Sequence, residues 1–294
     1  MFSDTHFHFS LVAGKAGYDG SSVLETMAER DTAFGQDVGT QADDLPERQK
    51  ILQKAVNSIS SEQNRSRAEQ FIHFSAGIWP SPEEVRNRVN GLAVLEKCIR
   101  EARSSSIPLF RKISAVGECG LDHHWNPSGA DGRTQDDFDT AMIQGEHELF
   151  MMQLELARTL DLPVIIHSRD AFKETLDCIQ ESGYDRGVIH CYSYGVEEAK
   201  AFLDRGWYIS FSGSVTYTKR TKMDAMTELL RLIPEDRILL ETDAPYLAPV
   251  PMRGNPNTPN YVEYTYAFIA AIRGVSVEKL CRTVDDNSCT LFGK

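Results

Sequence analysis

Short apolar segments rich in β-branched residues alternate with helical patterns along almost the whole chain of 294 residues. A strand, a helix and a second strand in succession predict a parallel pair, because the helix carries the chain back to the same end of the sheet. Eight strands within about 240 residues favour an α/β fold of the (β/α)8 TIM-barrel type over a doubly wound sheet. The expected strands are residues 1–8, 32–38, 70–77, 113–118, 162–167, 187–190, 207–211 and 237–241.

The segments between these strands carry the helices that such a barrel needs. The polar residues 35–67 are expected to hold a helix over 46–58 and then a solvated loop. No glycine-rich phosphate loop follows any expected strand, which weakens a nucleotide-binding Rossmann interpretation. We therefore expect residues 1–294 to form a single domain. The other expected helices are residues 82–104, 146–160, 171–181, 196–205, 222–232, 261–273 and 277–291.

The net charge of −12 limits the partners that the chain can bind. An acidic protein does not offer the broad basic surface that coats duplex DNA. Bound divalent cations would still add local positive charge where a scissile phosphate lies, so a nuclease remains compatible with this composition. The charge favours contact with a strand end or a small substrate.

The chain contains no run of about 18 apolar residues, so we expect no membrane span. Its start lacks the basic and apolar regions of a signal peptide. Six cysteines are scattered without a Cys-x-x-Cys pair, which favours an intracellular protein with reduced thiols.

The sequence Asp-Thr-His-Phe-His at residues 4–8 places two imidazoles on one face of the first strand. Successive side chains of a strand point to opposite faces, so Asp4, His6 and His8 share a face. Two histidines at this spacing can bind one divalent metal ion. Taken alone, the motif is equally compatible with two unrelated surface histidines.

Four histidines and two carboxylates fall at the carboxyl ends of the expected strands. Barrel enzymes build their active sites at that end. Imidazole and carboxylate ligands suit Mg²⁺, Mn²⁺, Zn²⁺ or Ni²⁺. A single strand-end histidine is more often a hydrogen-bonded polar group, but the whole set predicts a metal site. Its members are His6, His8, Glu118, His167, His190 and Asp243.

One metal ion would leave some of these ligands over, so we expect two ions. A carboxylate has two oxygens, and Glu118 is therefore the candidate bridge. The first ion is assigned to His6, His8, Glu118 and Asp243, and the second to Glu118, His167 and His190. Two ions about 3.5–4 Å apart could bind both the attacking and the leaving oxygen of a phosphodiester displacement.

Other chemically active residues lie near the expected ligands. Strand alternation turns Cys119 and Cys191 away from the metal side. His73 lies inside an expected strand and is assigned to a lower layer or to the surface. His123 and His124 follow Glu118 on the same loop, where they either touch substrate or are simply exposed.

These motifs resemble the TatD family of metal-dependent deoxyribonucleases, within the amidohydrolase-like barrels. The resemblance covers nearly the whole chain and rests on the order and spacing of five motifs. They are Asp-Thr-His-Phe-His at 4–8, Gly-Glu-Cys-Gly-Leu-Asp at 117–122, Leu-Pro-Val-Ile-Ile-His-Ser-Arg-Asp-Ala at 162–171, His-Cys-Tyr-Ser at 190–193 and Glu-Thr-Asp-Ala-Pro-Tyr-Leu-Ala-Pro at 241–249.

The resemblance implies the same ligand assignment and a TatD-like metal-dependent hydrolase domain over residues 1–294. It implies two-metal hydrolysis of DNA with Mg²⁺ or Mn²⁺, often as a 3′-to-5′ exonuclease on single strands. The implied partner is DNA, as single strands or 3′ ends, with no membrane and no obligate protein partner. The implied location is the cytoplasm.

Two departures from the family pattern concern substrate binding. Trp79 stands where the family's third strand ends in Gly-x-His-Pro, and it either stacks on a base or caps the barrel mouth. Asn255 replaces the lysine of the family's Arg-Gly-Lys-x-Asn, which removes a possible phosphate contact. With the long polar region before the third strand, these changes keep a small phosphoester, lactone or amide open as substrate.

The expected mechanism assigns each residue a task. Asp243 accepts the proton of the attacking water, and Glu118 holds the metal pair. Arg169 or Arg253 holds a neighbouring phosphate, although Arg169 could equally form an ion pair with Asp170 or Asp122. Glu241 shares the face of Asp243 and could orient a ligand histidine. A barrel that binds without catalysis is the remaining alternative, and the complete ligand set argues against it.

Overall fold

Eight parallel strands form one sheet in chain order in the computed structural model, which describes residues 2–14, 16–126 and 133–293. The bridge between Phe7 and Ala244 closes the sheet, and the Asp243 N–H donates to the His6 carbonyl at 2.8 Å. The predicted TIM barrel is confirmed. The strands are β1 (Asp4–Phe7), β2 (Gly35–Asp37), β3 (Ile72–Ala76), β4 (Ile113–Asp122), β5 (Val164–Arg169), β6 (Gly187–Ile189), β7 (Tyr208–Phe211) and β8 (Ile238–Leu240).

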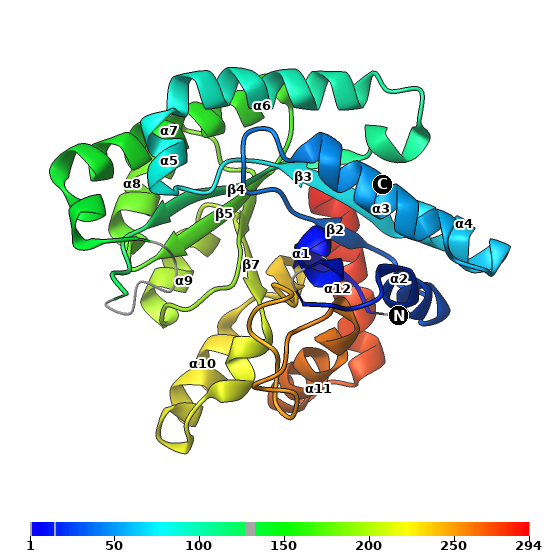
Figure 1. The fold of residues 1–294 in the computed structure, drawn as a ribbon. Helices are drawn as coiled ribbons and strands as arrows, with labels where there is room; N and C mark the ends of the chain where they lie inside the picture. The colour runs from blue at the N-terminus through cyan, green and yellow to red at the C-terminus, as the bar shows by residue number, and fades with distance from the viewer. Residues whose placement is uncertain (1, 15, 127–132, 294) are drawn as a thin grey trace.

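Helices surround the strands on the outside of the barrel (Figure 1). They cover the apolar outer faces of the strands, as the alternating sequence pattern requires. The helices are α1 (Phe9–Ala13), α2 (Gly20–Glu29), α3 (Leu45–Asn57), α4 (Glu62–Phe71), α5 (Pro82–Arg86), α6 (Arg88–Arg103), α7 (Thr140–Leu160), α8 (Phe172–Ser182), α9 (Val196–Leu203), α10 (Met223–Leu232), α11 (Val262–Arg273) and α12 (Val277–Phe292).

None of the helices within the described residues is both long and apolar enough to cross a membrane.

The structure corrects three of the expected elements. The expected solvated loop after α3 contains α4, whose first turn is capped by Ser61 accepting from the Asn64 N–H at 3.2 Å. The expected helix over residues 82–104 is divided at Asn87 into α5 and α6. The fourth strand does not end at Glu118 but continues to Asp122.

A close contact between two glycines sets the position of Glu118. A Cβ atom on Gly77, which follows β3, would lie 2.4 Å from the Cα atom of Gly117 in β4. Gly117 itself has a φ of 146°, a conformation that residues with a side chain rarely adopt. The approach to β4 therefore requires glycine at position 77, and position 117 requires glycine because of its φ and because an added Cβ atom would lie 2.7 Å from the Cβ atom of Ile165 in β5.

A buried arginine ties α3 to the strands beneath it. The guanidinium of Arg48 donates to Asp37 Oδ2 at 2.6 Å and to Asp44 Oδ1 at 2.9 Å. It also donates to the Ser75 carbonyl at 2.7 Å. Since removing one partner of a buried ion pair leaves an uncompensated charge, this contact fixes α3 against the ends of β2 and β3.

Candidate metal centre

The six predicted ligands come together at the carboxyl end of the barrel. They reach this end from β1, β4 and β5, and from the residues that follow β1, β6 and β8. Ligand atoms of His6, Glu118 and His190 all lie within 4.8 Å of one another, and so do those of His6, His8 and Asp243. His167 joins the first group through its contact with Glu118.

The carboxylate of Glu118 lies between two sets of histidines. Its Oε1 atom is 2.9 Å from His167 Nδ1 and 3.1 Å from His190 Nε2. Its Oε2 atom is 3.4 Å from His6 Nε2 and 3.8 Å from His8 Nε2. Each oxygen thus faces a different pair of imidazoles.

Asp243 completes the set around His6 and His8. Its Oδ1 atom is 3.5 Å from His8 Nε2 and 3.7 Å from His6 Nε2. Its φ of 55° is uncommon for a residue with a side chain, and such conformations occur at functional sites. Asp4 lies deeper and accepts from the Thr242 N–H at 2.9 Å and hydroxyl at 2.6 Å, so it ties β1 to the segment that carries Asp243.

Three of the four histidines are oriented by a second contact. His8 Nδ1 is 3.0 Å from the Val38 carbonyl. His167 Nε2 is 3.0 Å from Asp122 Oδ2, and His190 Nδ1 is 3.3 Å from Glu241 Oε1. Contacts of this kind hold ligand histidines in metal sites, because they fix the tautomer and leave the other nitrogen free for the metal.

His6 provides the test of whether these residues fit a metal ion. The side chain is fully buried, and within the described residues neither of its ring nitrogens has a hydrogen-bond partner. An unpaired buried nitrogen of this kind is costly unless something binds it. A divalent cation at Nε2, beside the oxygens of Glu118 and Asp243, would satisfy it, so the donor set fits the ion.

The charges in the centre oppose the effect of burial on Glu118. Burial alone would raise the pKa of Glu118, but the neighbouring His190 and His167 hold this pKa well below its usual range. Burial and the nearby His190 lower the pKa of His6. An ionised Glu118 carboxylate and a neutral His6 imidazole are protonation states that bind a metal ion. At His8, His167 and His190 burial is outweighed by the neighbouring carboxylates, which raise the pKa of each imidazole, so a cation that binds these three rings displaces protons.

Two positioning residues escaped the sequence analysis. Asp122, which contacts His167, is fixed by Arg133 through Nη2 to Oδ1 at 2.8 Å and Nη1 to the main-chain carbonyl at 2.6 Å. The guanidinium of Arg133 lies 5.4 Å from the Trp79 ring centroid and 4.9 Å from that of Phe138. Asp122 belongs to the Gly-Leu-Asp motif and was therefore detectable, whereas Arg133 stands in no motif.

Glu241 supports His190 through a network of its own. Its Oε1 atom accepts from the Cys191 N–H at 2.7 Å, and its Oε2 atom accepts from the Ser210 hydroxyl at 2.6 Å. These donors belong to β7 and to the segment after β6, so the position of the Glu241 carboxylate is fixed by contacts other than the one with His190.

The three predicted substrate contacts lie at different places around the centre. Trp79 is half-buried, and its ring centroid is 5.9 Å from that of His167. The side chain of Arg169 is 45% exposed and reaches 3.9 Å from Asp122 Oδ2. Arg253 is exposed, and its guanidinium lies 4.3 Å from the centroid of Tyr217.

The remaining histidines and cysteines belong to neither group of ligand atoms. Cys119 is buried with its sulfur 3.8 Å from the Ile165 carbonyl. His123 Nε2 lies 3.6 Å from Glu146 Oε2, and His124 Nδ1 lies 2.6 Å from Asp170 Oδ2.

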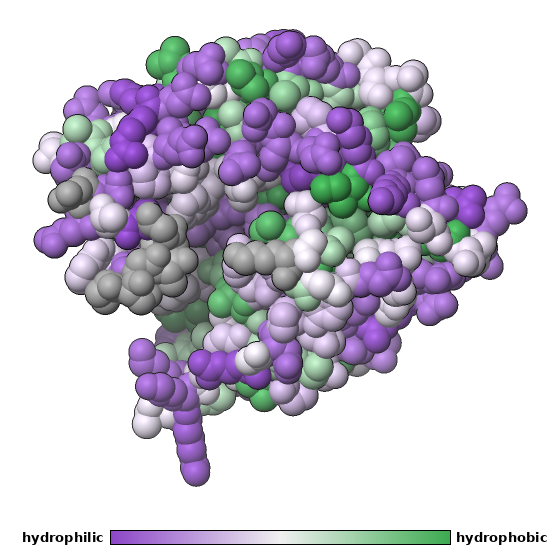
Figure 2. Space-filling model, viewed as in Figure 1, coloured by the Kyte–Doolittle hydropathy of each residue, from purple (hydrophilic) through white to green (hydrophobic). Residues whose placement is uncertain are grey.

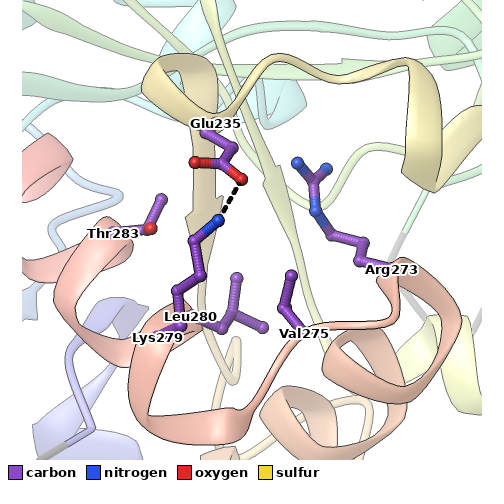
Figure 3. A pocket seen from close by; sticks show the side chains of 6 residues that line it. All are labelled: Glu235, Arg273, Val275, Lys279, Leu280 and Thr283. Carbon is purple, nitrogen blue, oxygen red and sulfur yellow. Dashed lines mark hydrogen bonds and ion pairs between the residues drawn. The ribbon is translucent and has the colours of Figure 1, made fainter.

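A crevice near the start of β8 does not belong to this centre. It lies beside η5 (Glu235–Arg237), which precedes β8, whereas Asp243 follows that strand. Figure 3 shows Lys279 reaching across it to Glu235, with Nζ 2.6 Å from Oε1. Because Lys279 and Glu235 pair with each other, neither of these two charges is free to bind a ligand in the crevice.

A family model and several named relatives match this chain. The family described as TatD related DNase matches residues 3–293. The uncharacterized metal-dependent hydrolase YabD of Bacillus subtilis is 36% identical over 183 residues, which span 62% of this chain and 66% of that protein. The match thus spans slightly less than two thirds of that relative.

A longer match is to a protein of Pantoea ananatis named 3′-5′ ssDNA/RNA exonuclease TatD. It is 33% identical over 258 residues, which cover 83% of this chain and 87% of that protein. Among solved structures, the TatD homolog YjjV of Escherichia coli superimposes with a TM-score of 0.78 at 25% identity. That match covers 100% of this chain and 98% of the other.

Proposed function

The chain belongs to the family of TatD related DNases, and from this premise we propose that it is a metal-dependent hydrolase that cleaves phosphodiester bonds of DNA. The proposed substrate is a single strand, attacked from its 3′ end. The position of Glu118 carries the proposal, because its two oxygens face separate sets of histidines. The name of the Pantoea relative supports the choice of substrate.

The donors divide into two sets for two divalent cations, which we propose to be Mg²⁺ or Mn²⁺, with Zn²⁺ or Ni²⁺ as alternatives. One set comprises His6, His8 and Asp243, the other comprises His167 and His190, and Glu118 is shared. Such a pair supplies Lewis-acid charge that acidifies water and neutralises a phosphate in the transition state.

The side chains perform the remaining steps. Asp243 accepts the proton of the attacking water at a carboxylate oxygen, because its main-chain N–H bond to His6 holds it over the centre. Asp122 and Glu241 keep His167 and His190 in position. The exposed Arg169 binds a phosphate next to the one that is cleaved.

Arg253 and Trp79 are assigned to the flanking nucleotides. Trp79 is half-buried between His167 and Arg133, and its accessible part is assigned to a base of the substrate. The guanidinium of Arg253 lies over Tyr217 and keeps its donors available for a phosphate.

Replacing Glu118 by alanine tests the proposal. We expect Glu118→Ala to hydrolyse a single-stranded oligonucleotide at least about 100-fold more slowly than the wild type in Mn²⁺, because the loss of a shared ligand affects both cations. Glu174→Ala, at an exposed position of α8, is the matched control and should retain activity. Circular dichroism should show the same fold in both variants. Wild-type hydrolysis by a folded Glu118→Ala protein would refute the assignment.

The net charge of −12 favours a second candidate, a hydrolase of a small phosphoester, lactone or amide that uses the same centre. A panel of single-stranded oligonucleotides, phosphomonoesters, lactones and acylated amines, assayed with Mn²⁺, separates the two functions. The nuclease proposal expects the highest kcat/KM with the oligonucleotide. A higher value for a small ester or amide would favour the second candidate.

A further inference from the structure

A groove with a volume of about 510 Å³ lies between the segments that follow β6 and β7. One wall is the segment between β6 and the start of α9. The other wall runs from η3 (Gly213–Tyr217) through η4 (Arg220–Lys222) into α10. Both walls begin at the carboxyl ends of strands, the end at which the ligands lie.

Hydrogen bonds connect the groove with residues of the centre. The hydroxyl of Tyr194, in the first wall, lies 2.9 Å from the hydroxyl of Ser168, the residue after His167. In the second wall, Ser214 Oγ is 3.0 Å from Ser212 Oγ, which in turn is 3.1 Å from the sulfur of Cys191. The groove therefore continues from the residues that adjoin His167 and His190.

The second wall of the groove carries cationic side chains, whereas the helix that follows the first wall starts with Glu197 and Glu198. Lys219 and Lys222 line it and are exposed, and Arg220 lies between them. Within residues 2–14, 16–126 and 133–293, none of the three forms an ion pair with a carboxylate. In a chain of net charge −12, a local cluster of free cations complements a polyanion.

Aromatic rings accompany these charges. Tyr194 and Tyr217 line opposite walls of the groove and are half-exposed. The hydroxyl of Tyr217 donates to the Ala248 carbonyl. The Cζ atom of Arg253 lies 4.3 Å from the centroid of the Tyr217 ring. Fixed aromatic rings next to cationic side chains are the combination with which proteins bind single-stranded nucleic acids.

We propose that this groove binds the nucleotides that flank the scissile phosphate of a single DNA strand. Lys219 and Lys222 contact backbone phosphates, and a tyrosine of the wall supports a base. The proposal rests on the proposed nuclease function and adds the path of the strand, which leaves the metal centre between α9 and α10. Figure 2 shows hydrophilic residues over the part of the surface formed by α10, at its lower left.

The test is the double variant Lys219→Ala/Lys222→Ala, assayed with Mn²⁺ on two substrates. One is a ten-nucleotide oligo-dT, and the other is bis(p-nitrophenyl) phosphate, a diester without flanking nucleotides. We expect KM for oligo-dT to rise about tenfold and the slope of log KM against log salt to fall by about 1 to 2, because two phosphate contacts are lost. The kinetics with bis(p-nitrophenyl) phosphate should stay unchanged.

The matched control is Lys54→Ala/Lys97→Ala, which removes the same charge from exposed positions of α3 and α6. It should leave KM and the salt slope for oligo-dT at the wild-type values. An unchanged KM for oligo-dT in the groove variant would overturn the groove and leave the nuclease proposal standing. An equal rise with both substrates would also overturn it. A wild-type protein that cleaves bis(p-nitrophenyl) phosphate but not oligo-dT would contradict the proposed function itself, and the groove with it.

Discussion

The division of the Glu118 oxygens between two pairs of histidines depends on the backbone around this residue. Gly77 lets β3 approach β4 and Gly117 lets β4 approach β5, and Glu118 then lies in the middle of the ligand set. That the six ligands lie toward the carboxyl ends of the strands was predictable from the sequence, because parallel strands bring these ends to one side, although β4 continues past Glu118 to Asp122. Which oxygen faces which histidine depends on local backbone geometry and was not visible.

Arg133 shows why part of the centre could not be predicted. It reaches Asp122 from a segment that carries no motif and no periodic pattern, and only tertiary packing brings the two together. Asp122 stood in a motif, but its spacing from Glu118 did not reveal that it would contact His167. These two contacts depend on side-chain packing, whereas the contact of Glu241 with His190 could be anticipated because Glu241 shares a strand face with Asp243.

At the same scale, we expect Asp122→Asn to weaken Mn²⁺ affinity by about 10- to 100-fold, because the amide no longer holds His167 as a carboxylate does. Isothermal titration calorimetry with Mn²⁺ on the metal-free protein measures this affinity. Asp170→Asn, at the partner of the exposed His124, is the control and should bind like the wild type. Equal affinities in the two folded variants would show that Asp122 does not support the centre.

Among the elements, the strands were easier to predict than the helices near the start of the chain. The strands are apolar, whereas α4 buries only Ala68 and Phe71 and is otherwise polar, so its hydrophobic pattern was too weak to identify. Its capping residue, Ser61, was the available signal. The break at Asn87 arises where the chain turns between α5 and α6, and no proline or glycine announces it.

His73, in strand β3, leads to a prediction about how the stability of the barrel depends on pH. Its ring stacks on Phe34 with centroids 4.6 Å apart, and burial together with the charge of Lys112 lowers its pKa to about 3. The unfolded chain takes up a proton near the ordinary pKa of about 6.5, so stability falls as the pH drops from about 6.5 toward 3. By pH 5 the loss attributable to His73 is about 2 kcal/mol.

Urea unfolding at pH 7.5 and at pH 5, with a chelator present throughout, measures this effect. His73→Phe keeps an aromatic ring against Phe34. Between pH 7.5 and pH 5 we expect the free energy of unfolding of this variant to fall by about 2 kcal/mol less than that of the wild type. The variant and the wild type share all other titrating groups, so the difference isolates His73. An identical loss in both proteins would mean that His73 does not govern this pH dependence.

At the scale of the whole molecule, the barrel gathers ligands that lie far apart in the sequence. His6 and Asp243 come from opposite ends of the chain and meet because β1 and β8 close the sheet. The acidic surface was apparent from composition, but the free cations of the groove were not, because their position depends on the path of the segment after β7.

The central claim is that two cations share Glu118, and crystals of the protein grown with excess Mn²⁺ test it most directly. We predict two peaks in the anomalous difference map, about 3.5–4 Å apart, on either side of the Glu118 carboxylate. One peak should lie within bonding distance of His6, His8 and Asp243, and the other should lie within bonding distance of His167 and His190. A single peak, or two peaks that do not share Glu118, would contradict the account.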